Sequence, residues 1–161
     1  MKQLQIADLV MFKGEYNRKL AKLIQIYTKS EYTHCGIVVD LQKDKVFVAE
    51  AQAKGYVIVT YDYPQLFNDT NLEFWRPKFK TNPTKITQFA LNHLGTPYGF
   101  VNYIGILLHS IFGFVYDNGT RCMICSEAVV RAYGIEKHFN KSPEYVYPGD
   151  IIKSNKFKLL K

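Results

Sequence analysis

One cysteine, one histidine and one carboxylate stand where they could act together as nucleophile, base and orienting group. Cys125 begins a short amphipathic segment that ends at Gly134, which predicts a helix with the sulfur in its first turn. The unpaired N–H groups and positive dipole end of a helix stabilise a thiolate, so we expect a lowered pKa for Cys125. His34 begins an apolar segment and Glu50 ends another. These residue types are those of an enzyme that forms a covalent acyl intermediate on sulfur.

The segments that carry His34 and Glu50 are predicted to pair as an antiparallel hairpin. Both are rich in β-branched residues, and the stretch between them is polar and typical of a turn. A turn centred on Gln42 places Val38 opposite Val46 and His34 opposite Glu50. Directly opposed residues share one face, with Cβ atoms about 4.5–5.5 Å apart, so Glu50 is predicted to hold the imidazole. A shift of one residue moves Glu50 to the other face.

Four short motifs occur in a characteristic order. They are Thr33-His34-Cys35-Gly36-Ile37-Val38, Glu50-Ala51, Leu94-Gly95-Thr96-Pro97-Tyr98 and Cys125-Ser126-Glu127. Together they resemble the circularly permuted branch of the NlpC-type papain-like cysteine peptidases, the YiiX-like proteins, in which the histidine precedes the cysteine. Segments 6–10 and 147–152 extend the resemblance over most of the chain. It implies Cys125 as nucleophile, His34 as base, Glu50 as orienter and Tyr98 near the oxyanion site.

The sequence departs from the unpermuted family just before the nucleophile. That family has a Gly-Gly pair and an Asp there, whereas Met123-Ile124 precedes Cys125 in this chain. A long apolar stretch, 100–115, also separates Cys125 from Tyr98. These departures argue against specificity for cell-wall peptides. The related lecithin:retinol acyltransferase group, with its Asn-Cys-Glu-His type of motif, fits less well.

The rest of the chain predicts one α+β domain over residues 1–161. With 161 residues, 47% of them hydrophobic, the chain is long enough for one packed core, and it shows no repeat or linker. Further strands are predicted at 6–12, 55–61 and 72–76, an edge strand at 151–160, and helices at 16–29, 83–94 and 101–112. The expected architecture is an antiparallel sheet packed against a few helices. The family resemblance implies a circularly permuted papain-like fold.

The helix at 83–94 has clear boundary signals. Asn82 is a good N-cap, Pro83 suits the first helical position and Gly95 follows the end. Its inward residues are predicted to be Ile86, Phe89, Ala90 and Leu94. The apolar stretch 100–115 is shorter than the ~20 residues that span a bilayer, so we expect a buried helix or a surface that receives an acyl chain.

Charge and cysteine content bound the partners and the compartment. The net charge of +7 suggests an anionic partner, such as an anionic lipid surface, or only a solvated surface, since the lysines are scattered. No nucleic-acid motif accompanies the charge, so nucleic acid is not an expected partner. An odd number of cysteines suits a reducing compartment, and no secretory signal precedes Asp8. We therefore expect a cytoplasmic protein.

The spacing of Cys122 and Cys125 also occurs in metal and redox sites. With His34 and Cys35 these residues nominally supply four zinc ligands. Successive side chains on a strand point to opposite faces, so His34 and Cys35 are not expected to converge on one metal. The Met-Ile spacer is also unlike that of a redox pair. We expect no metal and no cofactor.

The predicted function is a thiol hydrolase, a peptidase or amidase with a Cys125-His34-Glu50 triad that acts through a thioester on a small peptide or acyl-bearing substrate. The alternatives are a lipid acyltransferase or a lipid amide or ester hydrolase of the same fold, and a catalytically silent ligand-binding module. Each residue also has a structural reading: Cys125 and His34 as core residues, Glu50 as a strand end with Gln52 orienting the histidine, and Tyr98 as a turn aromatic.

Overall fold

The fold is built on a six-stranded antiparallel sheet, seen in a computed structural model that describes residues 4–14, 25, 26, 28–99 and 121–160. The strands are β1 (Leu9–Lys13), β2 (Tyr32–Gln42), β3 (Lys45–Gln52), β4 (Gly55–Asp62), β5 (Leu72–Pro77) and β6 (Phe157–Leu160), in the spatial order β4-β3-β2-β1-β5-β6. The helices are α2 (Tyr63–Asn68), α3 (Pro83–Asn92), α5 (Cys125–Tyr133) and α6 (Pro148–Lys153), with 3-10 turns η1 (Glu136–His138) and η2 (Pro143–Tyr145). The predicted α+β class is confirmed.

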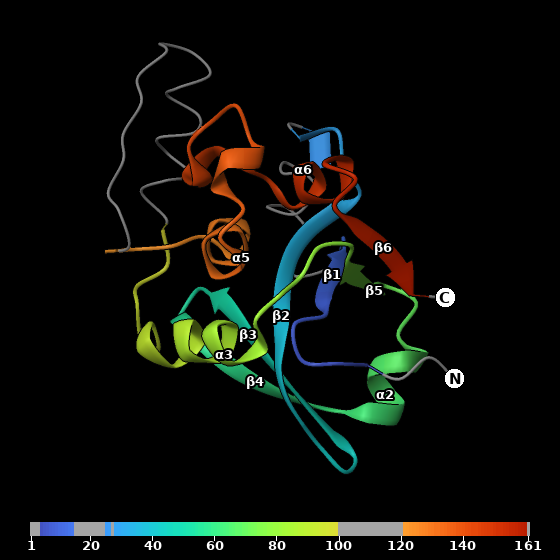
Figure 1. Ribbon diagram of the computed structural model, residues 1–161. Helices are drawn as coiled ribbons and strands as arrows, with labels where there is room; N and C mark the ends of the chain where they lie inside the picture. The colour runs from blue at the N-terminus through green and yellow to red at the C-terminus, as the bar shows by residue number, and fades with distance from the viewer. Residues whose placement is uncertain (1–3, 15–24, 27, 100–120, 161) are drawn as a thin grey trace.

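Both faces of the sheet are buried, and alternate residues of a strand serve opposite faces. Helices α3 and α5 lie together beside β3 and β4 in Figure 1 and cover one face. This face is formed by Cys35, Ile37, Ala49 and Ala51 of the sheet with Ile86, Ala90, Ala128 and Val129 of the helices. The other face carries Val10, Val38, Val46 and Val48, together with Leu66 of α2 and Leu4. Strand β2, buried on both sides, is therefore rigidly held where His34 lies.

The β2–β3 register differs from the prediction by two residues. Val38 pairs with Val48 and not with Val46, because the turn lies at 43–44 and Gln42 pairs with Lys45. The turn alone would put Glu50 on the wrong face of the sheet. A β-bulge between Val38 and Asp40 takes up one residue and restores the parity, so Glu50 returns to the face of His34.

Several predicted element boundaries need correction. The strand predicted at 6–12 begins only at Leu9, since residues 6 and 7 form a turn. Of the segment predicted as a strand at 151–160, the first three residues belong to α6, and only β6 pairs with β5. The predicted helix at 101–112 lies outside the described residues, as does most of the one predicted at 16–29.

Helix α3 shows where local signals succeed and where they fail. The Asn82 side chain accepts a hydrogen bond from the backbone N–H of Lys85 at 3.1 Å, as an N-cap should. Ile86 and Ala90 are buried as predicted. The prediction that Leu94 points inward is wrong: α3 ends before it, and Leu94 is 47% exposed.

Candidate active site

Cys125 occupies the first position of α5, as predicted. The preceding residue, Ile124, is extended and caps the helix, whereas Gly134 ends it in the left-handed conformation with φ 65°. Helix α5 packs against β2, and Cys125 is buried, with an exposed fraction of 2%. The first N–H groups of a helix have no acceptor within it, so the start of α5 directs donors toward the sulfur and its surroundings.

The imidazole of His34 contacts the carboxylate of Glu50 through Nε2. Both side chains are almost completely buried, and the second carboxylate oxygen, Oε1, accepts a hydrogen bond from the Tyr61 hydroxyl at 2.7 Å. The register places Glu50 beside Gly36, one pair beyond Ile37 and Ala49. A Cβ at position 36 would lie only 3.2 Å from the Glu50 Cβ, so glycine there leaves room for Glu50 to reach diagonally to His34.

Gln52, the alternative orienter, lies at the end of β3 and pairs with Gly55. It is Glu50 that contacts His34. On the other side of the imidazole the ring of Phe12 lies with its centroid 5.0 Å from that of His34. The aromatic ring and the carboxylate therefore fix the orientation of the histidine.

His34 and Cys35 both act on the charge of the Cys125 sulfur, Cys35 through its thiol and its backbone N–H. His34 and Cys35 both act on Cys125, although successive side chains of a regular strand point to opposite faces. Strand β2 is irregular here: Phe12 pairs with His34 but Lys13 pairs with Tyr32, and such a bulge re-aims the side chains beside it.

These contacts favour a charged pair over a neutral one. The hydrogen bond from the Cys35 thiol lowers the pKa of Cys125, burial raises it, and the charge and hydrogen bond of His34 bring it well below the usual value. Burial lowers the pKa of His34, but the Cys125 charge and hydrogen bond, together with Glu50, outweigh it and raise the pKa to about 10. The lowered pKa of Cys125 and the raised pKa of His34 both favour a thiolate beside an imidazolium.

Tyr98 lies beside the segment that leads into α5. Tyr98 forms a parallel β-bridge with Met123, and the N–H of Gly99 donates to the carbonyl of Met123 at 3.1 Å. The partly buried ring packs on Ile124, directly before Cys125. This position is near the nucleophile, while a role for the Tyr98 hydroxyl at an oxyanion stays a prediction.

Sequence reasoning missed Tyr61, Cys35 and Phe12 as neighbours of the site. Tyr61 is four pairs along β3–β4 from the Glu50 position, a reach that only the three-dimensional curvature of the sheet reveals. Phe12 faces His34 across the β1–β2 ladder, which links segments that are distant in the sequence. Alternation along β4 is the one signal that could have placed Tyr61 on the face of Glu50.

The donor set does not suggest a metal centre in the described part of the chain. Within it no three or more His, Cys, Asp or Glu side chains are arranged to hold a metal ion. Cys122 is partly exposed, unlike the buried Cys125 and Cys35.

Among the helices of the described residues, none is both long and apolar enough to cross a membrane.

Comparison with known proteins identifies the fold. No family model matches the sequence, and no curated protein matches it. The structure is similar to the crystal structure of the metalloprotein YiiX from Escherichia coli O157:H7, with a TM-score of 0.67. The alignment covers 99% of this chain and 98% of that chain at 19% sequence identity. The chain thus has a YiiX-like α+β fold.

Proposed function

We propose that this protein is a thiol hydrolase of the peptidase or amidase kind, built on a circularly permuted papain-like fold. The observation that carries the proposal is the position of the His34 imidazole, which contacts the Glu50 carboxylate and lies near enough to Cys125 for each to act on the charge of the other. A nucleophile, a base and an orienting group in one chain of contacts is the arrangement that acyl transfer through a covalent intermediate requires.

In the first half-reaction the Cys125 thiolate attacks the carbonyl carbon of the substrate. The backbone N–H of Cys125, at the start of α5, and the Tyr98 hydroxyl are the proposed donors to the resulting oxyanion. The His34 imidazolium then gives its proton to the leaving nitrogen, the carbon–nitrogen bond breaks, and a thioester remains on Cys125. Glu50 keeps the Nε2–H in place throughout and balances the imidazolium charge.

In the second half-reaction water replaces the leaving amine. Neutral His34 takes a proton from the water as it attacks the thioester carbon, the carbon–sulfur bond breaks, and the acid leaves while the thiolate and imidazolium are restored. An amine or alcohol in place of water would make the same site an acyltransferase. The two outcomes differ only in the acceptor, so they call for a direct measurement.

The test is capture of the acyl-enzyme by intact-mass measurement. The protein is mixed at neutral pH with a panel of short peptide amides and of lipid esters and amides, with and without anionic vesicles, because the net charge is +7. A mass increase equal to the acyl group on wild type but not on Cys125→Ala is the expected result. Decay of that adduct in water alone supports a hydrolase, and decay only on adding an amine or alcohol indicates an acyltransferase. No adduct from any donor would favour a ligand-binding module.

A further inference from the structure

A cluster of two buried carboxylates and one partly buried guanidinium lies next to the nucleophile. Glu127 and Glu144 are 0% and 1% exposed, and Arg131 bridges them. Arg131 Nε lies 3.0 Å from Glu127 Oε1, and its terminal nitrogen lies 3.2 Å from Glu144 Oε1. The other oxygen of Glu127, Oε2, accepts a hydrogen bond from the backbone N–H of Ile124 at 3.3 Å.

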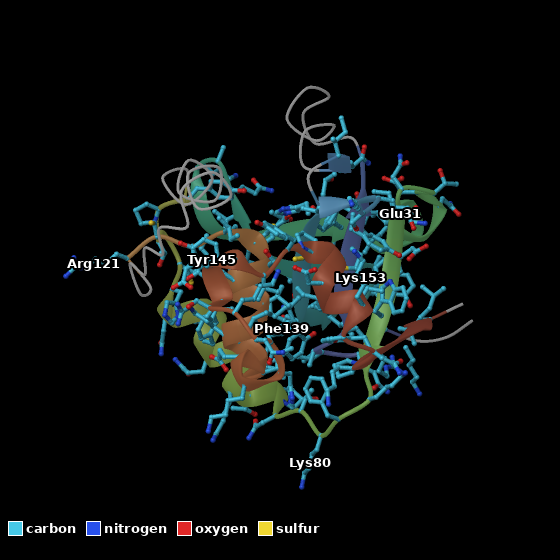
Figure 2. The ribbon with its side chains drawn as sticks, turned by 90° about the horizontal axis from the view of Figure 1, so that it is seen from above. Glu31, Lys80, Arg121, Phe139, Tyr145 and Lys153 are labelled. Atoms are coloured by element: carbon cyan, nitrogen blue, oxygen red, sulfur yellow. The ribbon has the colours of Figure 1, made fainter. Side chains whose placement is uncertain are left out.

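This placement is more than a helix-surface ion pair. Removing two carboxylates from water is costly even beside a guanidinium, so an apolar pair would serve the fold as well or better. The cluster instead ties three segments together: the residue before Cys125, the next turn of α5 at Arg131, and η2 at Glu144. Tyr145, next to Glu144, packs on Ile124 at the same point, and Figure 2 shows it beside the ribbon of α5.

We propose that Glu127 is a positioning residue for Cys125: its carboxylate, held by Arg131, fixes the first turn of α5 and thereby the sulfur and the N–H group presented to substrate. The inference rests on the proposed function in taking Cys125 as the nucleophile. Glu127 acts through the backbone of Ile124, whose N–H donates to its carboxylate.

The hold of Glu127 on the first turn of α5 is expected to depend on pH. The pKa of Glu127 is raised to about 7. Burial is the main cause and the charge of Glu144 adds to it, while Arg131 and the Ile124 N–H act in the opposite direction. Among the described groups, Arg131 on α5 and Glu144 on η2 act on the charge of Glu127, while His34 on β2 acts on Cys125. Above pH 7 the carboxylate accepts from both donors. Below it, one oxygen carries a proton, and the hold on the first turn weakens.

The test follows alkylation of Cys125 by iodoacetamide from pH 5.5 to 8.5, read by intact mass, in wild type, Glu127→Gln and Glu144→Gln. A rise near pH 7 that is present in wild type and lost in Glu127→Gln reports the titration of Glu127. Glu127→Gln should abolish that rise and leave the rate at pH 8 about tenfold lower. Glu144→Gln, the matched control that keeps Glu127, should move the rise to lower pH because a like charge has been removed.

Thermal unfolding of the same samples separates positioning from simple stability. If Glu127→Gln lowers the melting temperature but leaves the rate and pH profile of Cys125 unchanged, the cluster only stabilises the fold and the inference is overturned. If Glu127→Gln does not fold, an unchanged midpoint in Glu144→Gln overturns it instead. Failure of the proposed function looks different: Cys125 in wild type would then react no faster than Cys35 or Cys122 at any pH.

Discussion

Replacing Glu50 with glutamine tests how far the buried carboxylate sets the charge state of His34. In wild type Oε2 contacts His34 and Oε1 accepts from Tyr61 at 2.7 Å. Glutamine has one carbonyl oxygen, so it cannot accept from both partners, and it carries no charge. A hydrogen bond to a charged group contributes about 1.5–3 kcal/mol, and 1.36 kcal/mol corresponds to one pH unit. The pKa of His34, about 10 in wild type, should therefore fall by about 1–2 pH units in Glu50→Gln.

The assay is an NMR titration of the carbon-bound imidazole protons, with the His34 signals assigned from the spectrum of His34→Ala. Tyr61→Phe is the matched control, because it removes a partner of Glu50 but keeps the charge, and we expect its midpoint within about 0.5 pH unit of wild type. Cys125→Ala should lower the midpoint more than Glu50→Gln, since the thiolate contributes more to the raised pKa of His34. An unchanged midpoint in Glu50→Gln, or an equal fall in Tyr61→Phe, would refute the reasoning.

Three further predictions concern the same site. The Cys125 thiolate stabilises the fold fully above the ordinary cysteine pKa of 9.0, and this stabilisation is lost as pH falls through the lowered pKa of the folded state. The His34 imidazolium stabilises the fold fully below the ordinary histidine pKa of 6.5, and this stabilisation is lost as pH rises through about 10. The two trends cancel between pH 6.5 and 9.0. The free energy of unfolding of wild type minus that of Cys125→Ala, measured in urea, should therefore be constant in this range and decline on both sides; a steady slope contradicts the ion pair. Gly36→Ala should cost about 1–3 kcal/mol in urea unfolding, because the new Cβ would lie 2.6 Å from Val48 Cγ1 and 3.0 Å from the Ala49 carbonyl oxygen; a loss below about 0.5 kcal/mol would show that the sheet has room there. Cys35→Ala should slow alkylation of Cys125 at pH 6 roughly fivefold by removing a hydrogen bond to the sulfur, and an equal rate would mean that the Cys35 thiol does not stabilise the thiolate.

Local signals explain why the elements of the site were predictable. Helix α5 begins and ends where Cys125 and Gly134 indicated, because capping depends on a few neighbouring residues. The shared face of His34 and Glu50 also follows from alternation along two strands. What alternation leaves open is the offset between the strands, which depends on the turn at 43–44 and on the bulge next to Val38. The turn and the bulge together shift the register by two residues, an even number. His34 and Glu50 therefore share a face as predicted, although the predicted residue pairs are wrong.

Non-local packing accounts for what sequence reasoning missed. Phe12 and Tyr61 reach the site through pairings between β1 and β2 and across the curved sheet, and no short pattern records such contacts. Cys35 reaches Cys125 because β2 is irregular beside His34, a feature set by its pairing with β1. The sequence shows Glu127 only as an acidic residue in the first turn of a helix, whereas its burial and its link to Glu144 through Arg131 depend on where η2 packs.

The most direct test of the nucleophile and its base is the relative reactivity of the three thiols in the native protein. Brief exposure to iodoacetamide near neutral pH, followed by peptide mapping, should label Cys125 well before Cys35 and Cys122, since its pKa is lowered whereas burial raises that of Cys35. His34→Ala should slow the labelling of Cys125 by tenfold or more, on the order of one charge-assisted hydrogen bond. Equal labelling of the three thiols, or a rate for Cys125 that does not change in a folded His34→Ala variant, would contradict the assignment.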